Sequence, residues 1–445
     1  MLKYNQIITE GIKMKKKKLS PYIIIALSFL IVILIGTILL KLPITTTQQP
    51  LSWMDAFFTA TSMITITGIM PVSNVGVTFT LFGKIVIAAL IQIGGLSILT
   101  LTMYMLVILG AKINVNNRTL LKENLNYDSL QGIVKLLRRI VVLTLSIELI
   151  GIIINLFIFI PNMTNLGEAI GVSIFHAISS FNNAGVDILG VTEHISHFKD
   201  NVLFNINTLM LVILGGLGTM VIYDLINKRR WKKLTIHSKI VVKMTLLLLI
   251  IGMLLVKLFE GNQVTWLEAL FMSGTSRTAG FMTLNIHDLR NATIAIVMML
   301  MFIGAGPMST GGGIKITTFY VLIKSIFSFG RGKKTITHKR YISDETKIKS
   351  FILAQASILF IGMVSILLLA IENIGFKEAI FNTMSVLSNT GLMIGNINEY
   401  KDISKFIIIV TMYIGRVGPL TILHLIYSKS AKQSIVFIEE KLIIG

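Results

Sequence analysis

The sequence contains no cysteine, and only 14% of its 445 residues are charged. Without cysteine, disulfides, thiolate metal sites and cysteine nucleophiles are excluded. The seven histidines are scattered and show no metal-ligand spacing. Soluble proteins carry about a quarter charged residues. The low charge, the 53% of hydrophobic residues and the mean hydropathy of +0.79 therefore indicate a membrane protein that crosses the bilayer several times.

Acidic residues are also scarce, with 21 Asp and Glu against 41 Lys and Arg and a net charge of +20. Such an excess can indicate a nucleic-acid partner. Here, however, most basic residues fall in the N-terminal arm, in the linkers 111–139, 228–243 and 324–349, and in the C-terminal tail, whereas the intervening loops are mixed or acidic. This alternation follows the positive-inside rule. We expect no nucleic-acid binding, two cytoplasmic termini, an even number of spans and a location in the plasma (inner) membrane.

Eight stretches are long and apolar enough to span a bilayer, which takes about 20 residues. They are 21–40, 82–110, 140–160, 201–226, 241–258, 293–326, 351–371 and 406–427. The first follows a basic arm as in a signal peptide, but it is too long and no cleavage site follows. The two long linkers, 111–139 and 328–349, are too short for soluble domains, so we expect them to form helices or docking surfaces.

Four shorter apolar segments lie between these spans, and each ends in glycine. Each has a phenylalanine nine or ten residues before the glycine and a hydroxyl residue four positions after that phenylalanine. The phenylalanines are Phe58, Phe175, Phe271 and Phe381, and the hydroxyl residues are Ser62, Ser179, Thr275 and Ser385. Such self-similarity defines the architecture. We predict an all-α polytopic membrane protein with eight transmembrane helices and four re-entrant pore half-helices, in four pseudo-repeats of helix, pore loop and helix around one central pore.

The predicted organisation divides the chain as follows. A basic arm (1–20) precedes pore repeat 1 (21–110), a linker (111–139), repeat 2 (140–227), a loop (228–240), repeat 3 (241–327), a loop (328–349), repeat 4 (350–427) and the tail (428–445).

The four segments end in TITG, NNAG, RTAG and SNTG. Glycine lets backbone carbonyls approach a ligand closely, and non-helical backbone at membrane depth must line a water-filled path or be buried in protein. Four such loops around an axis would form a cation filter made of carbonyls. The predicted filter residues are Thr65, Ile66, Thr67, Gly68, Asn182, Asn183, Ala184, Gly185, Arg277, Thr278, Ala279, Gly280, Ser388, Asn389, Thr390 and Gly391. The alternative is that the four glycines only end ordinary interfacial helices.

A second glycine signature follows each loop, at 94–95, 215–216, 304–306 and 415–418. It lies 24 to 30 residues after each loop glycine, and its small residues indicate close packing around the axis. In the third copy, ten residues with five glycines and a proline (304–313) must break the sixth span. A phosphate-binding loop is rejected there, because the order GxxxxGK[ST] is missing.

The four loops together with the run Gly304–Thr318 closely resemble the membrane subunit of the Trk/Ktr/HKT potassium-transport superfamily, and most of all its KtrB-type branch. The resemblance covers the chain from about Pro21 onward. It implies a potassium pore in each subunit of a homodimer, docked on a cytosolic, nucleotide-binding regulatory ring of the RCK type (KtrA-type subunits). It also implies that the 304–313 segment is a gate and that Arg416 lines the cavity beside it. The gate residues so implied are Gly304, Ala305, Gly306, Pro307, Met308, Ser309, Thr310, Gly311, Gly312, Gly313 and Arg416.

Several polar residues in the apolar segments can be interpreted in more than one way. Arg277 would repel a cation if it faced the pore, so we expect it to point away and to pair with an acid such as Glu268 or Asp288, or with backbone carbonyls. Arg416 either raises the barrier for a cation or tethers carbonyls. For Glu148 and Asn155 we expect hydrogen bonds between helices rather than ion coordination.

We therefore predict passive, gated, inward potassium conduction with no enzymatic activity. No cofactor is expected in this chain beyond the transported K⁺, and nucleotides are expected only on the regulatory partner. A sodium-permeable or sodium-coupled transporter of the same fold is the alternative. A membrane-embedded transferase would need a cluster of His, Asp or Glu at one depth, which the sequence lacks. The apolar end Lys441–Gly445 is expected to tuck into the dimer interface, with a frayed tail as the alternative.

Overall fold

A computed structural model describes residues 21–72, 74–108, 118–119, 132–189 and 195–418. The basic arm, most of the 111–139 linker and the tail with its predicted docking at the dimer interface lie outside the described residues.

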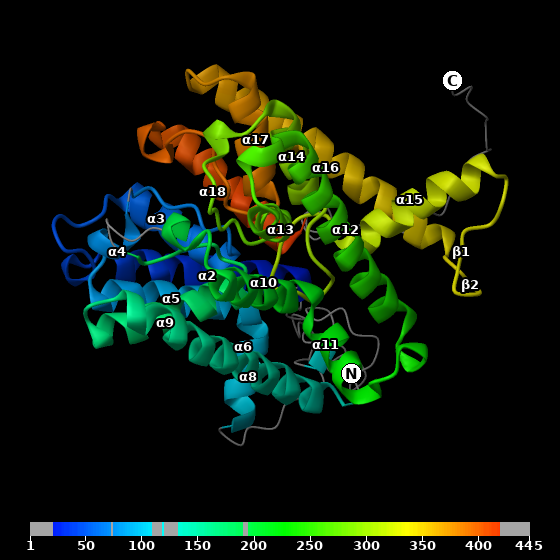
Figure 1. The fold of residues 1–445 in the computed structure, drawn as a ribbon, viewed down its shortest axis with the longest axis horizontal. Coiled ribbons are helices and arrows are strands. Elements are labelled where there is room, and N and C mark those ends of the chain that lie inside the picture. Colours follow the sequence, from blue (N-terminus) through cyan, green and yellow to red (C-terminus); the bar gives the residue numbers. More distant parts are fainter. Residues whose placement is uncertain (1–20, 73, 109–117, 120–131, 190–194, 419–445) are drawn as a thin grey trace, which may run out of the picture.

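The described chain forms four successive units, each with a long helix, a short helix, a loop that ends in glycine and a third helix (Figure 1). The long helices are α2 (Pro21–Lys41), α8 (Ile133–Phe159), α12 (Ile236–Glu260) and α16 (Asp344–Ile371). The short helices are α3 (Trp53–Thr65), α9 (Leu166–Phe181), α13 (Trp266–Thr275) and α17 (Phe376–Leu387). The third helices are α5 (Leu81–Leu96), α10 (Val202–Leu217), α14 (Asn291–Phe302) and α18 (Asp402–Val417).

Further helices connect the units. They are α4 (Val75–Thr78), α6 (Ile98–Ile108), α11 (Thr219–Lys228) and α15 (Ile316–Gly330). Short 3-10 turns are η1 (Pro43–Thr45), η2 (Ile160–Asn162), η3 (Ile195–Phe198), η4 (Trp231–Lys233), η5 (Gly261–Gln263), η6 (Ile286–Asp288) and η7 (Ile397–Glu399).

Within the described residues, α2, α8, α12 and α16 are each long and apolar enough to cross a membrane. The pair α10 and α11 would add a fifth span, although its two helices meet at a bend of 98°. A helical protein with several membrane-spanning segments is thus confirmed, while the number of eight spans stays a prediction.

Two predicted spans each consist of two helices in place of one continuous helix. The stretch 82–110 breaks at Ser97, and the stretch 201–226 breaks at Gly218, where φ is +66° and +89°. A right-handed helix cannot pass through a residue with positive φ. The glycine signatures therefore lie where helices end. The predicted break of the sixth span is confirmed, because α14 ends at Phe302 and α15 begins only at Ile316.

The 328–349 linker holds a small hairpin where we had expected helices or a docking surface. Strands β1 (Ile336–Thr337) and β2 (Arg340–Tyr341) pair antiparallel. Between them His338 and Lys339 both have positive φ, as a two-residue turn that matches strand twist requires. Otherwise the described fold is helical.

Three of the four short helices start at polar caps, and all four end among buried residues. Side chains of Ser52, Asn165 and Thr265 accept backbone N–H groups at the starts of α3, α9 and α13, which stabilises a helix end by about 1 kcal/mol. The four repeated phenylalanines are all buried, at 0 to 4% exposure. Each short helix is thus anchored in the protein interior by the same side chain.

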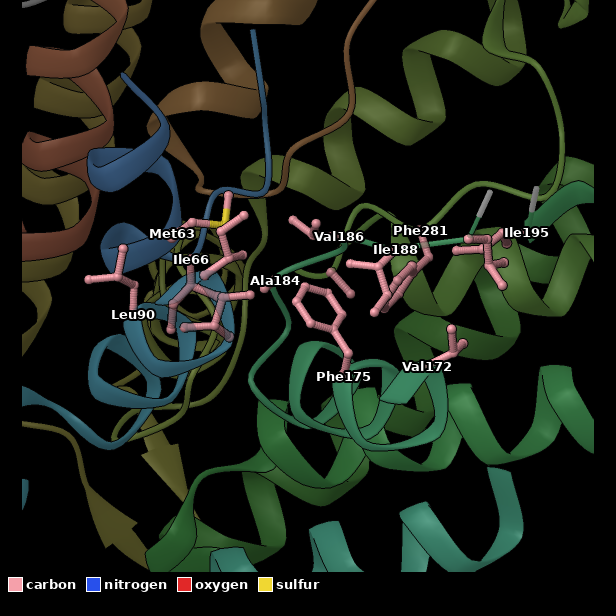
Figure 2. Close-up of a cluster of buried hydrophobic side chains, with 14 of the residues drawn as sticks. Met63, Ile66, Leu90, Val172, Phe175, Ala184, Val186, Ile188, Ile195 and Phe281 are labelled. Atoms are coloured by element: carbon pink, nitrogen blue, oxygen red, sulfur yellow. The ribbon is translucent and has the colours of Figure 1, made fainter. Parts of the chain in front are cut away.

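The units close on each other in a ring. The third helix of each unit packs against the short helix of the next, in the pairs α5 with α9, α10 with α13, α14 with α17 and α18 with α3. Apolar side chains fill the space between the units. In Figure 2, Met63 and Ile66 of the first unit lie in one cluster with Phe175 and Ala184 of the second and Phe281 of the third.

We predict that Phe58→Ala lowers the free energy of unfolding by about 3 to 5 kcal/mol, because it leaves a cavity in a fully buried site. Thermal unfolding of the detergent-solubilised protein measures this. Phe157→Ala is the matched control, because Phe157 on α8 is 73% exposed and faces out of the protein. Equal melting temperatures for the two variants would contradict the anchoring role of Phe58.

Candidate functional site

The loops that end in glycine, here called the four glycine loops (65–68, 182–185, 277–280 and 388–391), meet in a closed ring. A Cβ atom on Gly68 would lie 1.8 Å from the Ala184 carbonyl oxygen, and one on Gly185 would lie 1.9 Å from that of Ala279. A Cβ atom on Gly280 would likewise lie 2.0 Å from the Thr390 carbonyl oxygen. The ring closes at Gly391, where a Cβ atom would lie 2.0 Å from the Thr67 carbonyl oxygen. Each glycine thus touches the carbonyl just before the next glycine, and no other residue fits.

Backbone conformation fixes the loops in this arrangement. All four glycines have positive φ, between 69° and 89°. In the first, second and fourth loops, Ile66, Asn183 and Asn389 also have positive φ, which is a rare conformation for a β-branched residue such as isoleucine. The N–H groups of Thr67, Ala184 and Thr390 donate to carbonyls of the repeated hydroxyl residues at 2.8 to 2.9 Å. These bonds fold each loop back onto the end of its short helix.

The third loop differs, because it carries Arg277. Its side chain is 4% exposed, and its guanidinium donates to the Thr245 carbonyl of α12 at 3.3 Å. Glu268, one of the two acids considered as partners, instead caps the start of α13 through Thr265. Within the part of the chain that the structure describes, Arg277 therefore bonds a backbone carbonyl and forms no ion pair with an acid.

Amide side chains hold the second loop to its neighbours. Asn182 donates to the Gln92 oxygen at 2.9 Å and to Glu148 Oε1 at 3.0 Å, and Gln92 donates to Glu148 Oε2 at 3.1 Å. Asn155 bonds Asn207 and the Ser173 carbonyl. The expectation of bonds between helices for Glu148 and Asn155 is confirmed.

The fourth loop is tied to the first in the same way. The Asn389 amide donates to Thr67 Oγ1 at 2.9 Å and to the Met412 carbonyl of α18 at 3.0 Å. Amide side chains of the second and fourth loops therefore make hydrogen bonds within the protein, and the carbonyls at 67, 184, 279 and 390 each lie against the glycine of the preceding loop.

The second glycine signature supports the ring from behind. A Cβ on Gly94 would lie 2.2 Å from the Ile64 carbonyl, one on Gly215 would lie 1.8 Å from that of Phe181, and one on Gly415 would lie 2.2 Å from that of Leu387. In these three units, the third helix contacts the last turn of its own short helix. In the third unit, Gly304 instead packs against the other end of its own 304–313 loop. A Cβ atom on Gly304 would lie 1.9 Å from the Gly312 carbonyl oxygen.

The 304–313 loop touches the ends of units from all around the ring. Its N–H groups at Gly306 and Thr310 donate to the carbonyls of Gly216 and Gly215, and the Thr310 hydroxyl meets the Asn183 amide at 2.5 Å. Gly311 packs against Thr278 of the third loop, and Gly312 packs against Ser388 of the fourth. A segment in contact with three of the four glycine loops lies next to the axis of the ring.

Two cations hold this loop. Arg416 donates to the Thr310 carbonyl at 2.5 Å and to the Gly94 carbonyl of the first unit at 2.6 Å. The Lys315 ammonium donates to the Gly311 carbonyl at 2.7 Å. Arg416 therefore tethers backbone carbonyls, which is one of the two roles considered for it from the sequence. The role of Lys315 was missed from the sequence, although a charged residue in an apolar span is a functional candidate by default.

A cavity of about 100 Å³ lies between the loop and the first two units. Asn182, Gly215, Ser309, Thr310 and Arg416 are among its lining residues. Within the described ranges, no group of three or more His, Asp or Glu side chains could hold a metal ion.

The fold and this ring define a membrane transport protein built from four helix–loop–helix units. The chain belongs to the TrkH family of cation transport proteins, whose family model matches residues 8–434.

Known relatives agree over nearly the whole length. The Ktr system potassium uptake protein B of Bacillus subtilis is 39% identical, covering 91% of this chain and 92% of that protein. The potassium/sodium uptake protein NtpJ of Enterococcus hirae is 33% identical, covering 97% and 99%. The crystal structure of the potassium transporter TrkH from Vibrio parahaemolyticus matches with a TM-score of 0.71 at 19% identity, covering 94% of this chain and 87% of that one. The family and these relatives are transporters, not enzymes.

We predict that Glu148→Leu destabilises the protein by about 2 kcal/mol, because the buried amides of Gln92 and Asn182 lose their acceptor. Glu148→Gln, which keeps one acceptor oxygen, should have a smaller effect. Ser146→Leu on the outward face of the same helix is the control. If thermal unfolding shows the same midpoint for Glu148→Leu and Ser146→Leu, the network does not support the second loop.

Proposed function

We propose that this protein is the ion-conducting membrane subunit of a potassium uptake system and that the four glycine loops form its selectivity filter. The observation that carries the proposal is the closed ring of contacts between each loop glycine and the carbonyl before the next. The relatives named as potassium uptake proteins support the choice of ion. Conduction is passive and inward, down the electrochemical gradient.

The chemistry of the ring suits a dehydrated monovalent cation. Carbonyl dipoles replace the hydration shell of the ion, and the four short helices end directly before the loops, so the negative ends of their dipoles lie beside the ring. No carboxylate belongs to the four loops, which disfavours tight binding of a divalent ion. Arg277 is turned to a carbonyl of α12, so its charge does not oppose the cation at the ring.

The 304–313 loop is proposed as the gate. It contacts three glycine loops directly, and Arg416 links it to the first unit. It is glycine-rich and lies between α14 and α15, so it can leave the path without unpacking helices. Arg416 and Lys315 hold it closed, and the positive charge of Arg416 opposes a cation in the cavity that it lines.

A sodium-permeable or sodium-coupled transporter is the second candidate. The name of the Enterococcus hirae relative, which includes sodium, favours it. The four loops also differ in their side chains, unlike a filter of four identical strands.

The finer architecture belongs to the same proposal. It consists of eight spans, four re-entrant helices and cytoplasmic termini. The predicted division into four repeats, from 21–110 to 350–427, goes with it. Because the Bacillus subtilis relative is part of a Ktr system, we propose a homodimer that docks on a cytosolic regulatory ring with nucleotide-binding subunits.

We predict that Gly68→Ser, Gly185→Ser, Gly280→Ser and Gly391→Ser each lower the K⁺/Na⁺ preference, with K⁺ uptake and Na⁺ uptake measured in proteoliposomes. The added Cβ meets a carbonyl of the next loop, and the left-handed conformation costs a non-glycine residue about 1 to 2 kcal/mol. The folded protein should still be recovered from membranes.

Gly171→Ser is the matched control, because no atom lies within 4 Å of its added Cβ and it sits on α9, the short helix before the second loop. Unchanged selectivity in all four loop variants would remove the filter assignment.

We predict that deleting residues from the 304–313 loop raises ion flux and that Arg416→Ala does the same. The two changes should be non-additive, with a coupling of about 0.5 to 3 kcal/mol, because a tether has no role once its loop is gone. Flux in vesicles with and without the regulatory partner measures both. Lower flux in folded deletion variants would show that the loop is a structural part of the path, whereas additive effects would show that Arg416 acts on the ion independently.

Single cysteines test the orientation, since the chain has none of its own. We predict that cysteines at Arg229 and Arg331 stay protected from impermeant reagents in intact cells, while cysteines at Glu399 react. Labelling at position 229 from outside would invert the topology.

A further inference from the structure

A cavity of about 540 Å³ opens between the first turns of α8 and the helix α11, and no residue of the four glycine loops lines it. Its lining combines two kinds of side chain. It includes the basic side chains of Lys135, Arg138 and Arg139, which we call the rim, and the apolar side chains of Ile140, Leu143 and Ile226. We call this cavity the α8–α11 groove. It plays no part in the proposed filter or gate.

One of the three cations is already engaged. Arg139 bonds the Tyr223 hydroxyl, and its guanidinium lies over the Tyr223 ring, 4.9 Å from the ring centre. This contact joins α8 to α11 and gives the groove a fixed wall. Among the described residues, no hydrogen bond or ion pair is formed by Lys135 or Arg138, and both side chains are exposed.

The nearest acid on α11 does not neutralise them. The Asp224 carboxylate pairs with Lys228 at 2.6 Å and accepts the Thr235 N–H at 2.8 Å. The negative charge of Asp224 is therefore paired with Lys228, and the groove keeps a net positive rim.

An apolar stripe continues from this rim along α8. Val142, Leu145 and Leu149 follow Arg138 at helical spacing on the same face, and their side chains are 50%, 52% and 58% exposed. Helix α8 is one of the long apolar helices that can cross the bilayer. The basic rim thus lies at one end of a span, with the apolar stripe running from it toward the bilayer centre.

We propose that the α8–α11 groove binds an anionic phospholipid from the leaflet in which α8 begins. Lys135 and Arg138 receive the headgroup phosphate, and an acyl chain lies along Val142, Leu145 and Leu149. Charge complementarity selects this occupant, because a positive rim joined to an apolar stripe matches a molecule with an anionic head and an apolar tail. Basic pockets between membrane helices are known to hold such headgroups.

The experiment measures binding of phosphatidylglycerol and phosphatidylcholine to the purified full chain, by native mass spectrometry of defined lipid–detergent mixtures. We expect saturable binding of phosphatidylglycerol, weakened about tenfold or more in Lys135→Gln/Arg138→Gln, given the attraction that each basic residue contributes. The matched control is Lys232→Gln/Lys233→Gln, which removes the same charge from the exposed turn η4 and should bind phosphatidylglycerol like the wild type.

A second variant, Leu145→Asp, tests the acyl stripe without touching the rim and should also weaken phosphatidylglycerol. Equal binding of both lipids, no saturable binding by the wild type, or unchanged binding in Lys135→Gln/Arg138→Gln would each overturn the proposal. Inorganic phosphate at millimolar concentration is the competing probe. Full displacement of the lipid by phosphate, together with no effect of Leu145→Asp, would show a soluble-anion site instead.

Discussion

The close approach of each glycine loop to the next is the constraint on which the rest of the structure depends. Gly68, Gly185, Gly280 and Gly391 leave no room for a Cβ against the neighbouring carbonyl. The four short helices must therefore converge, and they do so through anchors in the same place of each unit, the buried phenylalanines. The glycines behind three of the loops meet the same need, because Gly94, Gly215 and Gly415 let a third helix touch a helix end.

The third unit departs from this pattern in its glycine loop and in its third helix. Its loop carries Arg277, and its residue before Ala279 does not take positive φ as Ile66, Asn183 and Asn389 do. Its third helix stops at Phe302, and the 304–313 loop occupies the place where the other units place glycine against a helix end. A ring of four similar units with one exception is a plausible way to combine a symmetric filter with a single gate, which is the division of labour that we propose.

Much of this could be predicted from the sequence, because repeats and glycine spacing are local signals. The four short helices, their phenylalanines and the break after Phe302 belong to that part. Other features depend on contacts that no local pattern encodes. The breaks at Ser97 and Gly218 lie inside apolar runs that are long enough for a helix, and the hairpin at Ile336–Tyr341 lies in a polar linker. The Lys315 bond to Gly311 and the order in which the loops meet around the ring required the structure.

The central claim is that the carbonyls of Thr67, Ala184, Ala279 and Thr390 hold the transported ion. Anomalous diffraction from crystals soaked in Rb⁺ or Tl⁺, which replace K⁺, tests it most directly. The account predicts a peak on the axis of the ring within about 3 Å of these four oxygens, and its loss in Na⁺ alone. A peak only in the cavity beside Arg416, or none near the four glycine loops in crystals that bind Rb⁺ elsewhere, would contradict the account.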